Sequence, residues 1–238
     1  MQITPTLLNI LIGIYICAAA YHVWVATKKR QAGAQLSFSI VCLIAALYCQ
    51  YEKAVYGALT DQAYLCALNR QVSIGFLFWI GVIWFAVYFA DLKLRWFAII
   101  LSIGAAGLAA LTYLLPTGIH LSAVHDFQYL RLPWGEQIAF PDTDFSYWAI
   151  VPWSYSLTVY VFMLYSSFRL WQKGRRRAAL VLLINILSIL SVAVFDYLID
   201  FRLIHWMYLA EYRFLPCVFS MAVYTSKSIK NQVPETTV

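Results

Sequence analysis

Ionisable and aromatic side chains gather near the predicted outer ends of apolar segments, where they could bind a small molecule. Asp196 and Asp200 are four residues apart, so on a helix they share one face. Glu211 and Arg213 follow inside the next apolar stretch. Ionisable groups in such stretches are costly and commonly face a cavity or one another. The candidate ligand-binding residues are Glu52, Arg70, Trp148, Trp153, Asp196, Asp200, Tyr208, Glu211 and Arg213.

The same residues also fit a purely structural interpretation, which the sequence leaves open. Arg213 could form an ion pair with Asp196 or Glu211 and so join neighbouring helices. The aromatic residues could belong to the belt that anchors membrane proteins at the lipid–water interface. Under this interpretation the charges and rings hold the bundle together and bind no ligand.

Residue types that support catalysis or metal binding do not converge at one depth. His22 belongs to the inner part of the first apolar stretch, and His120 and His125 to a long connection. His205 lies at the outer start of the last stretch, and the five cysteines show no CxxC spacing. A hydrolase or metal site needs its groups assembled at one depth. We therefore expect no catalytic residue, no metal, no cofactor and no enzyme activity in this chain.

Seven apolar stretches have about the 20-residue length of membrane-spanning helices. They cover residues 6–27, 36–56, 72–90, 94–115, 146–170, 178–199 and 204–225. Short connections favour antiparallel packing of sequence neighbours. The sequence predicts an all-α membrane protein, a seven-transmembrane helix bundle. The first stretch has its basic cluster after it, so we expect a retained signal anchor.

The charges divide between the two ends of these stretches. Twelve of the 17 Lys and Arg residues fall at one end, in the connections after the first, third and fifth stretches and in the tail. Nine of the 11 acidic residues fall at the other end. Excess Lys and Arg marks the cytoplasmic side, which predicts an N-out, C-in topology. The net charge of +6 then reflects orientation and contact with the lipid bilayer, and we expect no nucleic-acid partner.

One long outer connection, residues 116–145, joins the fourth and fifth stretches. Two β-prone runs flank its Pro133-Trp134-Gly135 turn, which predicts a β-hairpin-like loop. Its aromatic content argues against disorder. We expect it to fold over the outer mouth of the bundle.

Pro152 and Pro216 lie inside the fifth and seventh stretches. A proline in a helix interior removes one backbone hydrogen bond and favours a kink. The sequence therefore predicts kinks in both helices, with Pro216 as a flexible point.

The last third of the chain carries motifs that are distinctive together. They are Arg175-Arg-Arg-Ala-Ala-Leu, Phe195-Asp-Tyr-Leu-Ile-Asp, Tyr208-Leu-Ala-Glu-Tyr-Arg-Phe-Leu and Phe219-Ser-Met-Ala. This region resembles the seven-transmembrane N-terminal input (sensor) modules of bacterial histidine kinases, diguanylate cyclases and related receptors with diverse intracellular signalling modules. Asp196, Glu211, Tyr212 and Phe214 occupy the matching positions, whereas the first five stretches match in layout only.

The resemblance implies a sensory receptor in the bacterial inner membrane. Residues 1–225 would form the sensor domain and residues 226–238 a short cytoplasmic tail. The domain would bind a small molecule or lipid near the outer face and pass a helix movement to a cytoplasmic effector. Any kinase or cyclase activity would then reside in a domain absent from this chain. By the same resemblance we expect a homodimer.

Two other classes of membrane protein, retinal receptors and small-solute transporters, would leave different features in the sequence. A retinal receptor needs a lysine in the seventh helix for a Schiff base, and no lysine lies in its interior. A seven-helix transporter of small solutes would show corresponding Gly- or Pro-broken segments in its two halves. We see no such symmetry, although Pro152 and Pro216 keep the transporter as the alternative.

Overall fold

A computed structural model describes most of the chain. The described residues are 3–28, 32–125, 128–140, 142–200, 203–204 and 206–230, with the backbone alone for 200 and 227–230. Among them, six helices are long and apolar enough to cross a membrane. These are α1 Ile3–Lys28, α2 Ala32–Tyr56, α3 Asp61–Ala90, α4 Arg95–Leu114, α5 Ile150–Gln172 and α6 Arg176–Asp200. Length and composition thus support the predicted class, a helical multi-pass membrane protein.

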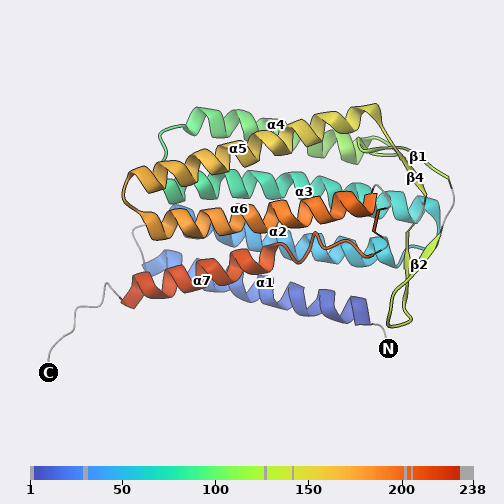
Figure 1. The fold of residues 1–238 in the computed structure, drawn as a ribbon, viewed down its shortest axis with the longest axis horizontal. Coiled ribbons are helices and arrows are strands. Elements are labelled where there is room, and N and C mark those ends of the chain that lie inside the picture. Colours follow the sequence, from blue (N-terminus) through green and yellow to red (C-terminus); the bar gives the residue numbers. More distant parts are fainter. Residues whose placement is uncertain are drawn as a thin grey trace, which may run out of the picture.

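The helices run side by side in one bundle (Figure 1). Consecutive helices pack together, except that α4 makes few contacts with α5, which packs also against α3. All strands lie at the end of the bundle where the chain begins. We call this end, with connections 57–60 and 115–149, the strand end. The opposite end, with connections 91–94 and 173–175, is called the basic end.

The seventh apolar stretch differs from the prediction of one helix over 204–225. Its helix, α7, spans Phe214–Lys230, and the described residues before it, 203–204 and 206–213, are not helical. Figure 1 shows this segment returning from the strand end along the bundle before α7 begins. The backbone N–H of Leu209 donates to Asp196 Oδ1 at 2.8 Å instead of to a helical carbonyl. A side-chain acceptor on α6 therefore replaces part of the expected helix ladder.

The prolines do not interrupt helix interiors. Pro152 is the third residue of α5, and Pro216 is the third residue of α7. N–H groups in the first turn of a helix have no partner within that helix, so proline removes nothing there. The expected kinks at these positions are replaced by helix starts.

Polar side chains close several helix ends. Thr60 Oγ1 accepts from the N–H of Ala63 at 3.2 Å and starts α3. At the other end of α3, Asp91 adopts the left-handed conformation (φ 48°). Lys173 Nζ donates to the carbonyls of Ala90 and Asp91, both at 2.9 Å. Basic residues at the basic end thus satisfy carbonyls that α3 leaves open.

Two short antiparallel strand pairs cross the strand end. Strand β1 (Leu121–Val124) pairs with β4 (Thr143–Phe145), and β2 (Tyr129–Arg131) pairs with β3 (Gln137–Ala139). The register of the second pair joins Tyr129 to Ala139 and Arg131 to Gln137. Gly135, at φ +85°, supplies the positive φ that the connecting turn needs.

Glu136 ties the β2–β3 pair to the start of α1. Its Oε2 accepts from the N–H of Thr4 and from Nε1 of Trp134, both at 2.9 Å. A carboxylate at a helix N-terminus satisfies an open N–H and complements the helix dipole. Trp134 also packs edge-on against Trp206, with centroids 6.1 Å apart. These contacts bind the strands to both the first helix and the segment before α7.

Aromatic rings anchor the first residue of α7 in the bundle. The Phe214 ring lies 4.5 Å from Phe78, 6.0 Å from Tyr15 and 6.3 Å from Tyr48, centroid to centroid. Phe214 is 2% exposed. Such edge and tilted pairs stabilise by roughly 0.5–1.5 kcal/mol each beyond burial. The start of α7 is therefore held among α1, α2 and α3.

Candidate functional site

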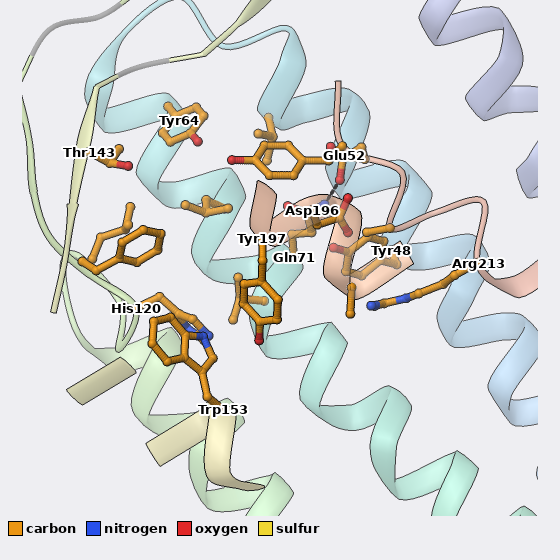
Figure 2. Close-up of a pocket in the computed structure, with 18 residues that line it drawn as sticks. Tyr48, Glu52, Tyr64, Gln71, His120, Thr143, Trp153, Asp196, Tyr197 and Arg213 are labelled. Carbon is orange, nitrogen blue, oxygen red and sulfur yellow. Dashed lines mark hydrogen bonds between the residues drawn. The ribbon is translucent and has the colours of Figure 1, made fainter. Parts of the chain in front are cut away.

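A cavity of about 270 Å³ lies at the strand end of the bundle. Its wall combines α2, α3, α5, α6, strands β1 and β4, and the segment before α7 (Figure 2). Elements far apart in the sequence thus converge on one space. Ligand pockets of drug size have volumes of roughly 300–1,000 Å³, so this cavity suits a smaller molecule.

One part of the cavity wall is polar. Glu52 of α2 accepts a hydrogen bond from Gln71 Nε2 of α3. Asp196 of α6 accepts from the N–H of Leu209. Arg213 brings a cation to the same cavity. Residues of both charge types therefore line one partly open cavity.

Arg213 is held by rings rather than by a carboxylate. Its guanidinium carbon lies 4.9 Å from the centroid of Phe214, 5.6 Å from Tyr48 and 5.9 Å from Phe78. Its Nε is buried and has no hydrogen-bond partner. The structural interpretation required an ion pair with Asp196 or Glu211. Among the described residues no carboxylate forms an ion pair with Arg213 within 4.0 Å.

The other part of the wall is aromatic. The ring of Trp153 packs edge-on against Phe145 of β4 and Tyr197 of α6, both at 5.9 Å. Tyr208 lies stacked against Phe140 at 6.1 Å. Phe145, Trp153, Tyr197 and Tyr208 all line the cavity. These contacts connect the strands to α5, α6 and the segment before α7.

His120 contributes a neutral imidazole to this wall. The ring is mostly buried and lies 6.0 Å from the ring of Phe76. Burial lowers the pKa of His120 from 6.5 to about 4. Its Nδ1 is buried with no hydrogen-bond partner. The imidazole is therefore neutral at pH 7.

The structure places the predicted binding residues in three groups. Glu52, Trp153, Asp196, Tyr208 and Arg213 line the cavity. Arg70, Trp148 and Glu211 lie elsewhere, and the side chain of Asp200 lies outside the described residues.

Arg70, Trp148 and Glu211 do not line this cavity. Arg70 is exposed and lines a separate surface hollow beside the end of α4. Trp148 is 71% exposed. Glu211 is fully buried outside the cavity wall, where Tyr15 Oη donates to its backbone carbonyl at 2.6 Å. Sequence position near a helix end did not reveal which way each side chain points.

Several cavity residues were missed from the sequence. Tyr48 precedes Glu52 by one helical turn, so the shared helix face was available as a clue. Tyr197 adjoins Asp196, and Gln71 is a polar residue within an apolar helix. His120 belongs to the long connection 116–145, and nothing in the local pattern shows that it reaches the cavity.

Metal ligands do not converge in the described part of the chain. No group of three or more His, Cys, Asp or Glu residues there could hold a metal ion. The closest such pair is His125 Nε2 and Asp144 Oδ2, 2.6 Å apart and exposed on the strands. The cysteines are free thiols, three of them buried in the bundle. The arrangement is suited to binding through charges, hydrogen bonds and aromatic faces.

Comparison with known proteins does not assign a family to the chain. No protein-family model matches the chain, and no curated protein matches it. The resemblance of the last third to sensor input modules therefore stays a prediction.

Proposed function

We propose that this chain is a membrane-embedded sensory domain that binds a small molecule in the strand-end cavity. The observation that carries the proposal is the placement of Glu52 and Arg213. They line one cavity with opposite charges, yet no ion pair joins them. An uncompensated charge in an apolar environment is costly, roughly 3–5 kcal/mol when a buried partner is missing. A bound molecule that contacts these groups would offset that cost.

The cavity adjoins the elements that would carry a conformational change. Arg213 directly precedes α7, and Asp196 of α6 holds Leu209 of the preceding segment. The far end of α7 lies at the basic end of the bundle (Figure 1). A ligand that binds two arrangements of this segment unequally would shift the position of α7.

The charge distribution and the resemblance give the proposal its cellular setting. The basic end carries Lys28, Lys93, Arg95, Lys173 and the arginines that start α6. Excess Lys and Arg favours the cytoplasmic side, so the strand end and the cavity would face outward. In this setting the chain crosses a bacterial inner membrane seven times, N-out and C-in. The end of α7 would then meet a histidine kinase or diguanylate cyclase type of effector, in a homodimer.

Native mass spectrometry of the protein purified in mild detergent tests the binding. Wild type should carry a co-purified small molecule, and Arg213→Gln should lose it. Arg70→Gln is the matched control, because Arg70 is exposed and lies outside the cavity. A bound species that persists in Arg213→Gln, or wild type free of any small molecule, would argue against a sensory cavity.

A transporter of small solutes is the second candidate, favoured by one observation. The segment before α7 is not helical in its described part, and α7 begins well inside the bundle. Transporters place substrate at such broken helices. Uptake of the co-purified molecule into proteoliposomes would favour transport. Tight binding with no uptake would favour the receptor.

A further inference from the structure

We infer that the cavity ligand is a small zwitterion of the amino-acid class, with a carboxylate, an ammonium group and an apolar body. The inference rests on the proposed function, since it names the ligand of the same cavity. It is argued from Arg213, Glu52 and the aromatic part of the wall.

Arg213 fits the carboxylate of such a ligand. Its guanidinium lies against three aromatic rings, which orient it without supplying a negative charge. Among the described residues it has no ion-pair partner within 4.0 Å. A guanidinium presents a planar fork of donors that matches a carboxylate in a bidentate fashion. The start of α7, directly after Arg213, adds the partial positive charge of a helix N-terminus.

Glu52 fits the ammonium group. It is 2% exposed, and the hydrogen bond from Gln71 orients its carboxylate at the cavity. Glu52 also forms a hydrogen bond with the side chain of Tyr56, and two hydrogen bonds leave further acceptor positions on an ionised carboxylate. In Figure 2 the Tyr48 ring separates Glu52 from Arg213. The ring face offers an additional contact for a cation, as aromatic faces do.

The remaining wall fits an apolar or aromatic body. Trp153, Tyr197, Phe145 and Tyr208 supply ring faces and edges. The cavity volume of about 270 Å³ favours a molecule of amino-acid size over a lipid.

The separation of the charges distinguishes a zwitterion from a simple ion. A monovalent anion would use Arg213 but would meet the carboxylates of Glu52 and Asp196, and a monovalent cation would meet Arg213. Like charges in a low-dielectric space repel strongly. A zwitterion can pair its carboxylate with Arg213 and its ammonium group with Glu52, and it adds no net charge to the cavity.

Thermal unfolding of the purified full chain tests the ligand class. Each common L-amino acid and glycine betaine is added to wild type in detergent, and the shift in unfolding temperature is measured. At least one should raise it. For the best amino acid, the matched amine without the carboxylate and the matched acid without the ammonium should bind at least ~10-fold more weakly.

Charge-removing variants assign the two ends of the ligand. Arg213→Gln should weaken binding of the amino acid and the acid, and it should strengthen binding of the amine because it removes a like charge. Glu52→Gln should weaken the amino acid and the amine, and it should strengthen binding of the acid for the same reason. Arg70→Gln and Asp61→Asn, both at exposed positions outside the cavity, should change none of the affinities.

Three results would overturn the inference. One is an absence of any temperature shift across the amino acids and betaine. The others are an amine or an acid that binds as tightly as the amino acid. If native mass spectrometry meanwhile detects a different molecule that depends on Arg213, the sensory cavity stands and only the ligand class fails.

Discussion

At the scale of single residues, the contacts of Arg213 distinguish a ligand-binding site from a set of ion pairs that only joins the helices. The guanidinium is surrounded by Tyr48, Phe78 and Phe214, and its Nε has no partner. A charge kept in this position without an ion pair costs free energy in the folded state, and a ligand that pairs with it would offset that cost.

Arg213→Met should therefore fold well but bind nothing. A methionine fills the space beside the rings and removes the unpaired charge. We expect an unfolding free energy within about 1 kcal/mol of wild type, or higher. Denaturant titration in detergent measures it. A loss of about 3 kcal/mol or more would show that Arg213 has a structural partner after all.

His120 should make the folded state sensitive to acid. Burial lowers the pKa of His120 from 6.5 to about 4, so the unfolded chain binds the proton more readily. The neutral His120 stabilises the folded state by about 3 kcal/mol at most, and this stabilisation is fully present above pH 6.5. It is lost as the pH falls toward 4. Unfolding temperature measured across this range should fall for wild type and fall less for His120→Gln. Equal pH profiles would contradict a buried neutral imidazole.

At the scale of elements, six helices could be predicted within a few residues at most ends, because long apolar runs determine them. The start of α3 was the exception: Asp61 begins it, far before residue 72, because Gln62, Asn69 and Arg70 hide the helix in a polar pattern. The prediction of one helix over 204–225 was wrong in its first half, because α7 begins only at Phe214. There the N–H of Leu209 donates to Asp196 of α6 instead of to a carbonyl of its own helix. This hydrogen bond joins two separate segments, so the local sequence pattern carries no information about it.

The bond between Leu209 and Asp196 should stabilise the segment before α7. Asp196→Ala removes the acceptor and leaves a backbone N–H unpaired, which should cost about 1–3 kcal/mol. Asp196→Asn keeps an acceptor oxygen and should cost less. Thermal unfolding of both variants measures the difference. Equal losses would show that the charge of Asp196, rather than this hydrogen bond, matters.

Glu136 should hold the strands on α1. Burial alone would raise its pKa, but donors from Thr4 and Trp134 outweigh burial and hold the pKa of Glu136 below 4.5. Its contribution is therefore present above pH 4.5 and is lost as the pH falls below that value. In Glu136→Ala, hydrogen exchange should rise in the first turn of α1 and in β2 and β3. Unchanged exchange would mean that the rings of Trp134 and Trp206 suffice.

At the scale of the whole molecule, the two ends of the bundle differ in chemistry. The strands, the cavity and most acidic residues lie at the strand end, and most basic residues lie at the other end. The cavity residues Glu52, Asp196 and Arg213 were predicted from their types and depth, whereas His120 required the assembled fold. Convergence of distant segments is a property of packing that spacing alone cannot supply.

The orientation of the bundle can be measured directly. In a background with the native cysteines replaced, Asp61→Cys places a thiol at the strand end and Lys93→Cys places one at the basic end, both at exposed positions. A membrane-impermeant thiol reagent added to intact cells should label the first and spare the second. The reverse pattern would invert the topology and place the cavity inside the cell.

The central claim is that a small molecule lies between Glu52 and Arg213. A cryo-electron microscopy map of the protein purified in lipid nanodiscs tests it most directly. We predict density for a non-protein molecule that contacts both residues beneath the strands. A closed cavity in which Arg213 forms an ion pair with Asp196 or Glu211 would contradict the account.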